Sequence, residues 1–156
     1  MTYGSKSFDG LAECVAEVRG CINKVLGDRE GVDLVELVAS ELASNAIRHS
    51  VSGDRGGQFT VHLAEFVDRW RIRVDDEGGS SVPRVCAVPL IECIEDLDQF
   101  GVEAEAGRGL ALVAAVSETW GVLGGASARA VWAEILMPGS SSWDRALEPA
   151  APATRA

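Results

Sequence analysis

Two segments near the start of the chain repeat apolar residues at the spacing of an α-helix. Residues 11–27 place apolar side chains every three or four positions, which predicts an amphipathic helix ending near Gly27. Residues 32–48 repeat this pattern and predict a second helix. The turn-forming residues 50–54 mark the end of this helix. Residues 1–8 fit either an edge strand or a mobile arm, and the pattern does not decide between them.

Alternation of apolar and polar residues predicts strands in two further regions. Residues 58–66 and 70–76 both alternate, and the short link between them indicates an antiparallel hairpin. Residues 119–123 and 130–137 are typical of a closing pair of strands around the Gly124–Gly125 turn. The strands therefore come as two neighbouring pairs, one on each side of the middle of the chain.

The middle of the chain is less regular. Residues 82–106 lack a clear period and carry six acidic side chains against a single cation, Arg84. A stretch of this length between regular elements is usually either functional or disordered. Gly107–Arg108–Gly109 follows it and is predicted to open a helix over residues 110–118. The last segment, residues 138–156, is rich in Ser, Pro and Ala, which predicts a disordered tail.

This order of helices and strands predicts an α+β fold. Helices and antiparallel strands that do not strictly alternate favour a two-layer sandwich, with the helices on one face of a mixed, mostly antiparallel sheet. A length of 156 residues is that of one domain. We therefore expect a single folded domain over residues 1–137, followed by the tail.

Charge and hydropathy exclude several classes of function. Asp and Glu number 24 against 14 Lys and Arg, so the formal net charge is −10. This balance argues against direct binding of nucleic acid, which depends on clustered cations, but it permits a nucleotide held through Mg²⁺ and backbone amides. No run approaches the roughly 18 apolar residues of a membrane span, and residues 1–10 lack the features of a signal peptide. We expect a cytoplasmic protein without a membrane partner.

The four cysteines form two pairs with a spacing of seven residues, Cys14 with Cys21 and Cys86 with Cys93. Structural zinc sites usually space their cysteines by about two to four residues. Seven residues are two helical turns, which puts Cys14 and Cys21 on one face of the first helix. Ordinary packing is the first interpretation, because free cysteine behaves as a small apolar residue. Redox sensing and an unusual metal site are the alternatives.

The second predicted helix carries a polar stripe beside its apolar face. Glu41, Asn45 and His49 follow one another at intervals of four residues. At roughly 100° per residue, Asn45 and His49 lie about 40° and 80° from Glu41 around the helix. Half-buried carboxylate, amide and imidazole groups are costly unless they meet a ligand, an ion or one another. The stripe is thus either a binding site or a solvated edge with an internal bond between Glu41 and Asn45.

Two glycine-containing segments could contribute to the same site. Asp75–Gly79 ends a predicted strand, where an acidic side chain can accept hydrogen bonds from a base while glycines allow close approach, although this is also a common turn sequence. Gly107–Arg108–Gly109 could cradle an anion with backbone amides at a helix start. It lacks the Lys-Ser/Thr signature of a Walker loop, and it does not follow a strand as a dinucleotide-binding motif would.

Taken in this order, the motifs resemble those of a known superfamily. The motifs Glu41-x-x-x-Asn45-x-x-x-His49, Asp76-x-Gly78 and Gly107-x-Gly109-Leu110 are similar to the N, G1 and G2 boxes of the GHKL ATPases and kinases. Within this superfamily, the chain most resembles the anti-sigma-factor serine kinases of the RsbW and SpoIIAB type. Residues 120–135 look like the closing strands of that group. The resemblance covers residues 8–137 and implies the Bergerat ATP-binding fold.

The resemblance implies a role for each matching residue. Asn45 would coordinate the Mg²⁺ that bridges the phosphates of ATP, and Glu41 would act as general base toward a serine or threonine of a protein substrate. Asp76 would accept the adenine amino group, because the Val-x-Asp-x-Gly register favours it over Asp75. His49 would support the helix end. The further residues expected near the nucleotide are Gly78, Gly79, Gly107, Arg108, Gly109 and Leu110, with residues 82–106 as a lid.

The sequence also departs from the family pattern. Ser80 stands where a further glycine is often found, which could tighten the turn. The acidic lid offers the phosphates little positive charge, so Mg²⁺ and Arg108 would have to offset it. Transfer of the phosphoryl group to a protein is therefore less firmly implied than nucleotide binding.

The implied function is an ATP-dependent protein serine kinase that also sequesters a sigma factor. In such a partner switch, phosphorylation of an antagonist protein prevents the antagonist from capturing the kinase, which usually acts as a homodimer. The alternative is a binding module that acts by sequestration alone, with ATP as a structural ligand or with no nucleotide. A catalytic fragment of a histidine kinase is disfavoured, because the sequence contains no dimerising phosphoacceptor helix.

Overall fold

The computed structural model describes residues 2–80 and 103–140. Three α-helices and five strands make up the described part, with a short 3₁₀ turn, η1, at Val51–Gly53. In chain order, the elements are β1 (Thr2–Asp9), α1 (Cys14–Leu26), α2 (Val32–His49), β2 (Gln58–Glu65), β3 (Arg69–Asp76), α3 (Glu103–Val116), β4 (Thr119–Gly124) and β5 (Arg129–Leu136).

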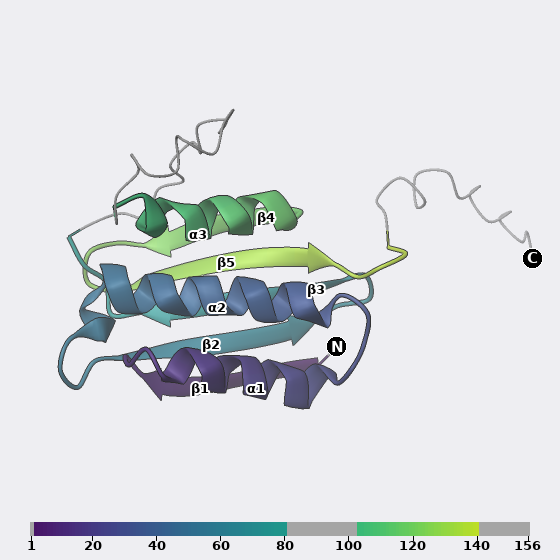
Figure 1. Cartoon of the computed structure of the whole chain (residues 1–156), viewed down its shortest axis with the longest axis horizontal. Coiled ribbons are helices and arrows are strands. Elements are labelled where there is room, and N and C mark those ends of the chain that lie inside the picture. The colour runs from purple at the N-terminus through teal and green to yellow at the C-terminus, as the bar shows by residue number, and fades with distance from the viewer. Residues whose placement is uncertain (1, 81–102, 141–156) are drawn as a thin grey trace, which may run out of the picture.

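The five strands form one sheet in the order β1-β2-β3-β5-β4, and each neighbouring pair is antiparallel. All three helices lie on one face of this sheet, with α2 over its centre (Figure 1). The predicted α+β two-layer sandwich is therefore confirmed, and the described strands contain antiparallel pairs alone. The order also shows that β1, which the sequence pattern left open, is an edge strand.

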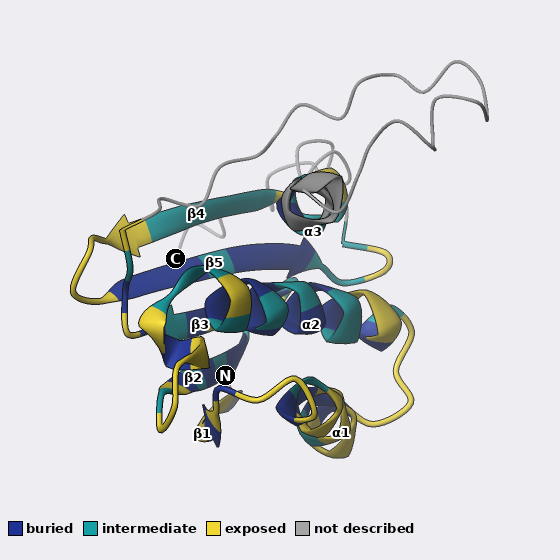
Figure 2. Cartoon of the chain, turned by 60° about the vertical axis from the view of Figure 1, so that its left-hand side comes forward, coloured by how far each residue is buried: buried dark blue, intermediate teal, exposed yellow. Residues whose placement is uncertain are grey.

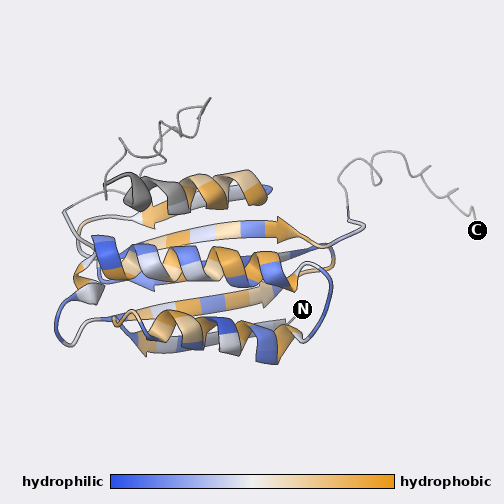
Figure 3. Cartoon of the chain, viewed as in Figure 1, coloured by the Kyte–Doolittle hydropathy of each residue, from blue (hydrophilic) through white to orange (hydrophobic). Residues whose placement is uncertain are grey.

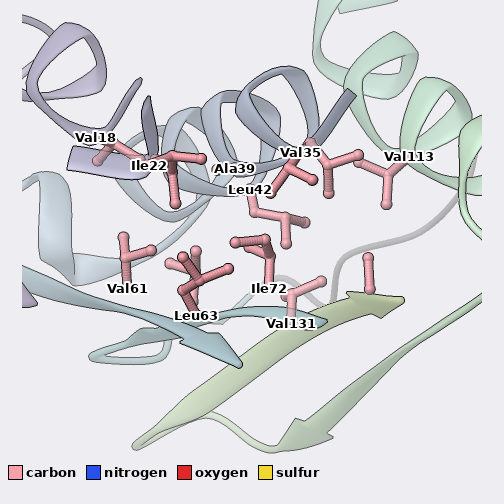
Figure 4. Close-up of a cluster of buried hydrophobic side chains, with 14 of the residues drawn as sticks. Val18, Ile22, Val35, Ala39, Leu42, Val61, Leu63, Ile72, Val113 and Val131 are labelled. Carbon is pink, nitrogen blue, oxygen red and sulfur yellow. The ribbon is translucent and has the colours of Figure 1, made fainter. Parts of the chain in front are cut away.

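The core lies between the helices and the sheet. The buried side of α1 faces the rest of the fold and its exposed side turns outward (Figure 2), and Figure 3 shows apolar and polar residues alternating along α1 and α2. Val35 and Leu42 of α2 point toward Ile72 and Val131 on the central strands (Figure 4). These four side chains are at most 2% exposed, and burying one such side chain stabilises the fold by about 1.5–3 kcal/mol. Packing in this layer therefore fixes α2 against β3 and β5.

The predicted boundaries of most elements are confirmed to within a few residues. The hairpin of β2 and β3 forms as expected, with Phe66 N–H donating to the Arg69 carbonyl at 2.9 Å. The first helix begins at Cys14 and not near Leu11, whose side chain is 51% exposed. The second helix runs one residue further than expected, to His49.

The prediction that a helix begins at Leu110, after a glycine turn, is wrong. Helix α3 already begins at Glu103, so Gly107, Arg108 and Gly109 lie inside it and do not form a turn before it. The sequence Glu-Ala-Glu-Ala at residues 103–106 explains the early start, because alanine and glutamate are strong helix formers. Acidic residues are also favourable at the positive end of the helix dipole.

Some expectations lie partly or wholly outside the described residues. Of the predicted lid, residues 103–106 belong to α3, and the remainder lies outside the described part. Residues 141–156 of the predicted tail also lie outside it, as do Cys86 and Cys93. Cys14 is buried in α1 and Cys21 is half-buried there, and both are free thiols, which agrees with ordinary packing.

None of the helices in the described part combines the length and the apolar character that crossing a membrane requires.

Candidate functional site

Helix α2 holds the three polar residues of the predicted stripe. Its buried residues include Val35, Val38 and Leu42, which press one side of the helix against the sheet and leave the stripe at the border of that side. Ser50, which follows the helix, has extended backbone, and its hydroxyl donates to the carbonyl of Ala46 at 2.7 Å. The end of α2 is therefore fixed by local hydrogen bonds.

Asn45 is a buried polar residue of α2 whose side-chain nitrogen lacks a hydrogen-bond partner. It is only 8% exposed, and its Nδ2 atom has no hydrogen-bond partner. A buried polar group left without a partner costs about 1–3 kcal/mol. An amide offers both an oxygen that can bind a hard cation and a nitrogen that can donate to a phosphate. The unpaired Nδ2 thus fits a phosphate oxygen of the predicted nucleotide, while the predicted Mg²⁺ would have to bind through Oδ1.

Glu41 lies one helical turn before Asn45 and directs its carboxylate to helix α3. A Cβ atom placed on Gly109 would stand only 2.4 Å from Oε2 of Glu41. Glycine at this position therefore leaves room for the carboxylate, because any larger residue would meet it. The structure in this way brings together two residues that the sequence assigned to separate motifs. None of the hydrogen bonds in the described part uses this carboxylate, which leaves it available to a ligand.

Asp76 lies at the end of β3, on the face that the helices cover. It pairs with Arg129 across the β3–β5 ladder and is 6% exposed. Its Oδ1 accepts a hydrogen bond from the N–H of Gly78 at 2.7 Å. Asp75 points to the opposite face, where it binds Arg73 and His62. The strand register thus supports the choice of Asp76 over Asp75 as the candidate ligand.

The two glycines after Asp76 allow its turn to pack on the end of α2. Gly78 has a φ of +76°, which favours glycine, and its carbonyl accepts a hydrogen bond from the N–H of Val51 at 2.8 Å. A Cβ atom on Gly79 would lie 3.0 Å from the carbonyl oxygen of His49. The turn is further held by the N–H of Glu77, which donates to Ser52 at 2.9 Å. Asp76 and the stripe on α2 are therefore joined through the helix end.

Arg129 is a site residue that the sequence analysis missed. Its Nε donates to Oδ2 of Asp76 at 3.2 Å, and its Nη2 donates to the carbonyl of His49 at 3.0 Å. The contact at the end of α2 uses the backbone carbonyl of His49, so the role of the His49 side chain stays a prediction. The available signal in the sequence is an arginine at the start of a strand whose only other charged residue is Glu134.

Helix α3 contributes differently from the prediction. Gly107 and Arg108 lie within it, and of the two the structure describes only the backbone. Their amides therefore belong to the helix and do not form the predicted cradle at its first turn. Leu110 is 3% exposed and packs in the core. The role of these residues near the phosphates stays a prediction.

The sequence prediction places Mg²⁺ at this site together with the phosphates of the nucleotide. Within residues 2–80 and 103–140, no three His, Cys, Asp or Glu side chains lie close enough together to hold a metal ion. Mg²⁺ commonly binds one or two protein groups together with substrate phosphates. Oδ1 of Asn45 could be one such protein group, while its unpaired Nδ2 could donate to a phosphate oxygen.

Comparison with known proteins identifies the kind of domain. The model of the histidine kinase-like ATPase domain matches residues 7–132. The chain belongs to this family. Among solved structures, the histidine kinase AdeS of Acinetobacter baumannii is similar over 88% of this chain and 70% of that one, with 17% sequence identity and a TM-score of 0.42. No curated protein gives a significant match.

Membership of the histidine kinase-like ATPase family confirms the resemblance to the GHKL superfamily. It supports ATP as the ligand of the domain and kinase or ATPase chemistry as its activity. The match includes α2, the Asp76 turn and α3, so the motifs that carried the resemblance all lie within it.

Proposed function

We propose that this ATPase domain binds ATP together with Mg²⁺ and transfers the γ-phosphoryl group to a serine or threonine of a partner protein. The observation that carries the proposal is the buried, unpaired amide of Asn45, one helical turn after Glu41 on α2. Asn45 would bind the ion that bridges the phosphates, and Glu41 would accept the proton of the attacking hydroxyl. Asp76, at the strand end beside the end of α2, would receive the adenine amino group.

The proposed biological role is that of an anti-sigma factor in a partner switch. Its support is the resemblance of residues 41–49 and 120–135 to the anti-sigma-factor serine kinases. The domain would sequester a sigma factor, and phosphorylation of an antagonist protein would prevent the antagonist from releasing it. Capture of a sigma factor by the purified chain, reversed by an unphosphorylated antagonist, is the expected result. If no sigma factor is captured, this role is refuted while nucleotide binding stands.

Titration calorimetry with ATP, with and without Mg²⁺, tests the nucleotide site. We expect saturable binding that depends on Mg²⁺, and Asn45→Ala should abolish the Mg²⁺-dependent part while leaving the fold intact. Asn23→Ala is the matched control, because Asn23 is an exposed asparagine on α1. Unchanged affinity of Asn45→Ala for Mg-ATP would refute the metal role of this residue. A wild-type chain that does not bind ATP would favour the nucleotide-independent binding module.

A second variant separates binding from transfer. Glu41→Gln keeps the shape of the side chain but cannot act as a base, so ATP affinity should persist while phosphoryl transfer falls about 10²–10⁴-fold. Glu36→Gln, nearly one and a half turns earlier on α2, is the control. Transfer should be followed with labelled ATP and the antagonist protein. Full transfer by Glu41→Gln would show that the base lies elsewhere.

A further inference from the structure

Arg129 and Asp76 form an ion pair that is almost completely buried. Their side chains are 2% and 1% exposed, and Nε of Arg129 lies 3.2 Å from Oδ2 of Asp76. Charged side chains are rarely buried to this degree unless they are paired. The two residues are direct cross-strand partners at the start of β5 and the end of β3. The pair is therefore built into the register of the sheet.

The same guanidinium group also reaches the end of helix α2. Its Nη2 donates to the carbonyl of His49 at 3.0 Å, at a helix terminus where carbonyls lack partners within the helix. One planar cation thus connects the carboxylate of Asp76 with the helix that carries Glu41 and Asn45. A lysine could supply the charge but not this forked geometry, because its ammonium group is a single point.

The bonds to Asp76 determine what its carboxylate can still accept. Oδ1 takes the N–H of Gly78 and Oδ2 takes Nε of Arg129. A carboxylate offers about four lone-pair positions in all, so these two bonds leave one position unused on each oxygen. The amino group of a ligand could donate a hydrogen bond to the Asp76 carboxylate. A carbonyl oxygen of a ligand could not, because two acceptors would then face each other and repel. Holding the Asp76 carboxylate in this orientation therefore favours a base with an amino group at this point.

We propose that Arg129 is a positioning residue for base recognition, which holds the Asp76 carboxylate as an oriented acceptor and fixes it relative to the end of α2. This inference rests on the proposed binding of ATP. Arg129 acts through Asp76 and through the His49 carbonyl, and its effect is greatest on the choice between amino and oxo bases. A residue that only stabilised the fold would weaken all nucleotides to the same extent.

The test compares ATP with inosine triphosphate, in which an oxygen replaces the 6-amino group. Affinities of the full chain for both nucleotides are measured by calorimetry for wild type, Arg129→Lys and Arg129→Met. We expect Arg129→Met to reduce the preference for ATP by about tenfold, which corresponds to one hydrogen bond to a charged group. Arg129→Lys should lie between the two, because it keeps the charge but loses the forked geometry that reaches both Asp76 and the His49 carbonyl.

Arg71→Met is the matched control. Arg71 binds Glu134 on the opposite face of the sheet, so the variant should keep the wild-type preference for ATP. If Arg129→Met does not fold, as judged by circular dichroism, Arg129→Lys carries the test and should reduce the preference at least threefold. An unchanged preference in the folded Arg129 variants, or tighter ATP binding, overturns the role of Arg129 alone. Failure of the wild-type chain to bind ATP overturns the proposed function and this inference together.

Discussion

Replacing Gly109 by alanine changes the position of the Glu41 carboxylate without touching Glu41 itself. The added Cβ atom would lie 2.4 Å from Oε2 of Glu41, whereas ordinary contact begins at 3.4 Å. The carboxylate oxygen must therefore move by about 1 Å, the difference between these two distances. The movement falls on the flexible end of a side chain, because the backbone of α2 is held against the sheet by its buried residues.

Activity and stability should respond to this change in opposite directions. A misplacement of about 1 Å in a catalytic group can cost about 10²-fold in rate, so turnover of ATP should fall by 10- to 100-fold, as an order-of-magnitude estimate. Alanine is a better helix former than glycine by about 0.5–1 kcal/mol, and Gly109 lies inside α3. The variant should thus be as stable as the wild type or slightly more stable.

The assay follows ADP release at saturating Mg-ATP in the presence of the antagonist protein, with ATP affinity from calorimetry and unfolding free energy from urea titration. Gly20→Ala is the control, because Gly20 lies within α1 and a Cβ atom there meets nothing within 4 Å. It should gain the same helix propensity and keep full turnover. Wild-type turnover by Gly109→Ala would refute the catalytic importance of the Glu41 position. A large loss of stability would show that more than one side chain has moved.

Two further predictions concern the sheet and the turn that follows β3. Burial tends to raise the pKa of Glu134, but hydrogen bonds from Arg69 and Arg71 outweigh it and lower this pKa. The folded protein should therefore lose this stabilisation as the pH falls below about 4.5. In Glu134→Gln, the unfolding free energy from urea titration should change less between pH 7 and pH 3 than in the wild type. Gly78→Ala should cost about 1–3 kcal/mol in urea unfolding and weaken ATP binding, because the positive φ there strains other residues; wild-type stability would contradict this.

The periodicity of the sequence predicts most of the fold because the core is a single layer. Residues 32–48 carry one apolar stripe at helical spacing, and α2 buries that stripe against the sheet. Strands β2 and β3 alternate in the sequence and in their burial. The same alternation puts Asp75 and Asp76 on opposite faces, which is why the register could select Asp76. Local pattern and tertiary packing agree in these elements.

The sequence could not reveal contacts that depend on distant pairing. Arg129 meets Asp76 across 53 positions of the chain, and only the register of β3 with β5 brings them together. The start of α3 is predicted wrongly because closely spaced glycines such as Gly107 and Gly109 usually indicate a turn. One of these glycines is needed instead for the space it leaves to Glu41. A glycine that serves close packing and one that serves a turn look alike in a single sequence.

The two ends of the candidate site differ in how completely the protein satisfies its polar groups. Asp76 already holds bonds from Gly78 and Arg129, so its geometry is set before any ligand arrives. Asn45 has a buried donor without a partner, so its environment is completed only by a ligand. The proposed base end is therefore preorganised, and binding there should lose little conformational freedom. At the proposed phosphate end, a ligand would remove the cost of the unpaired Nδ2, so the phosphate groups should contribute most of the ligand-induced stabilisation.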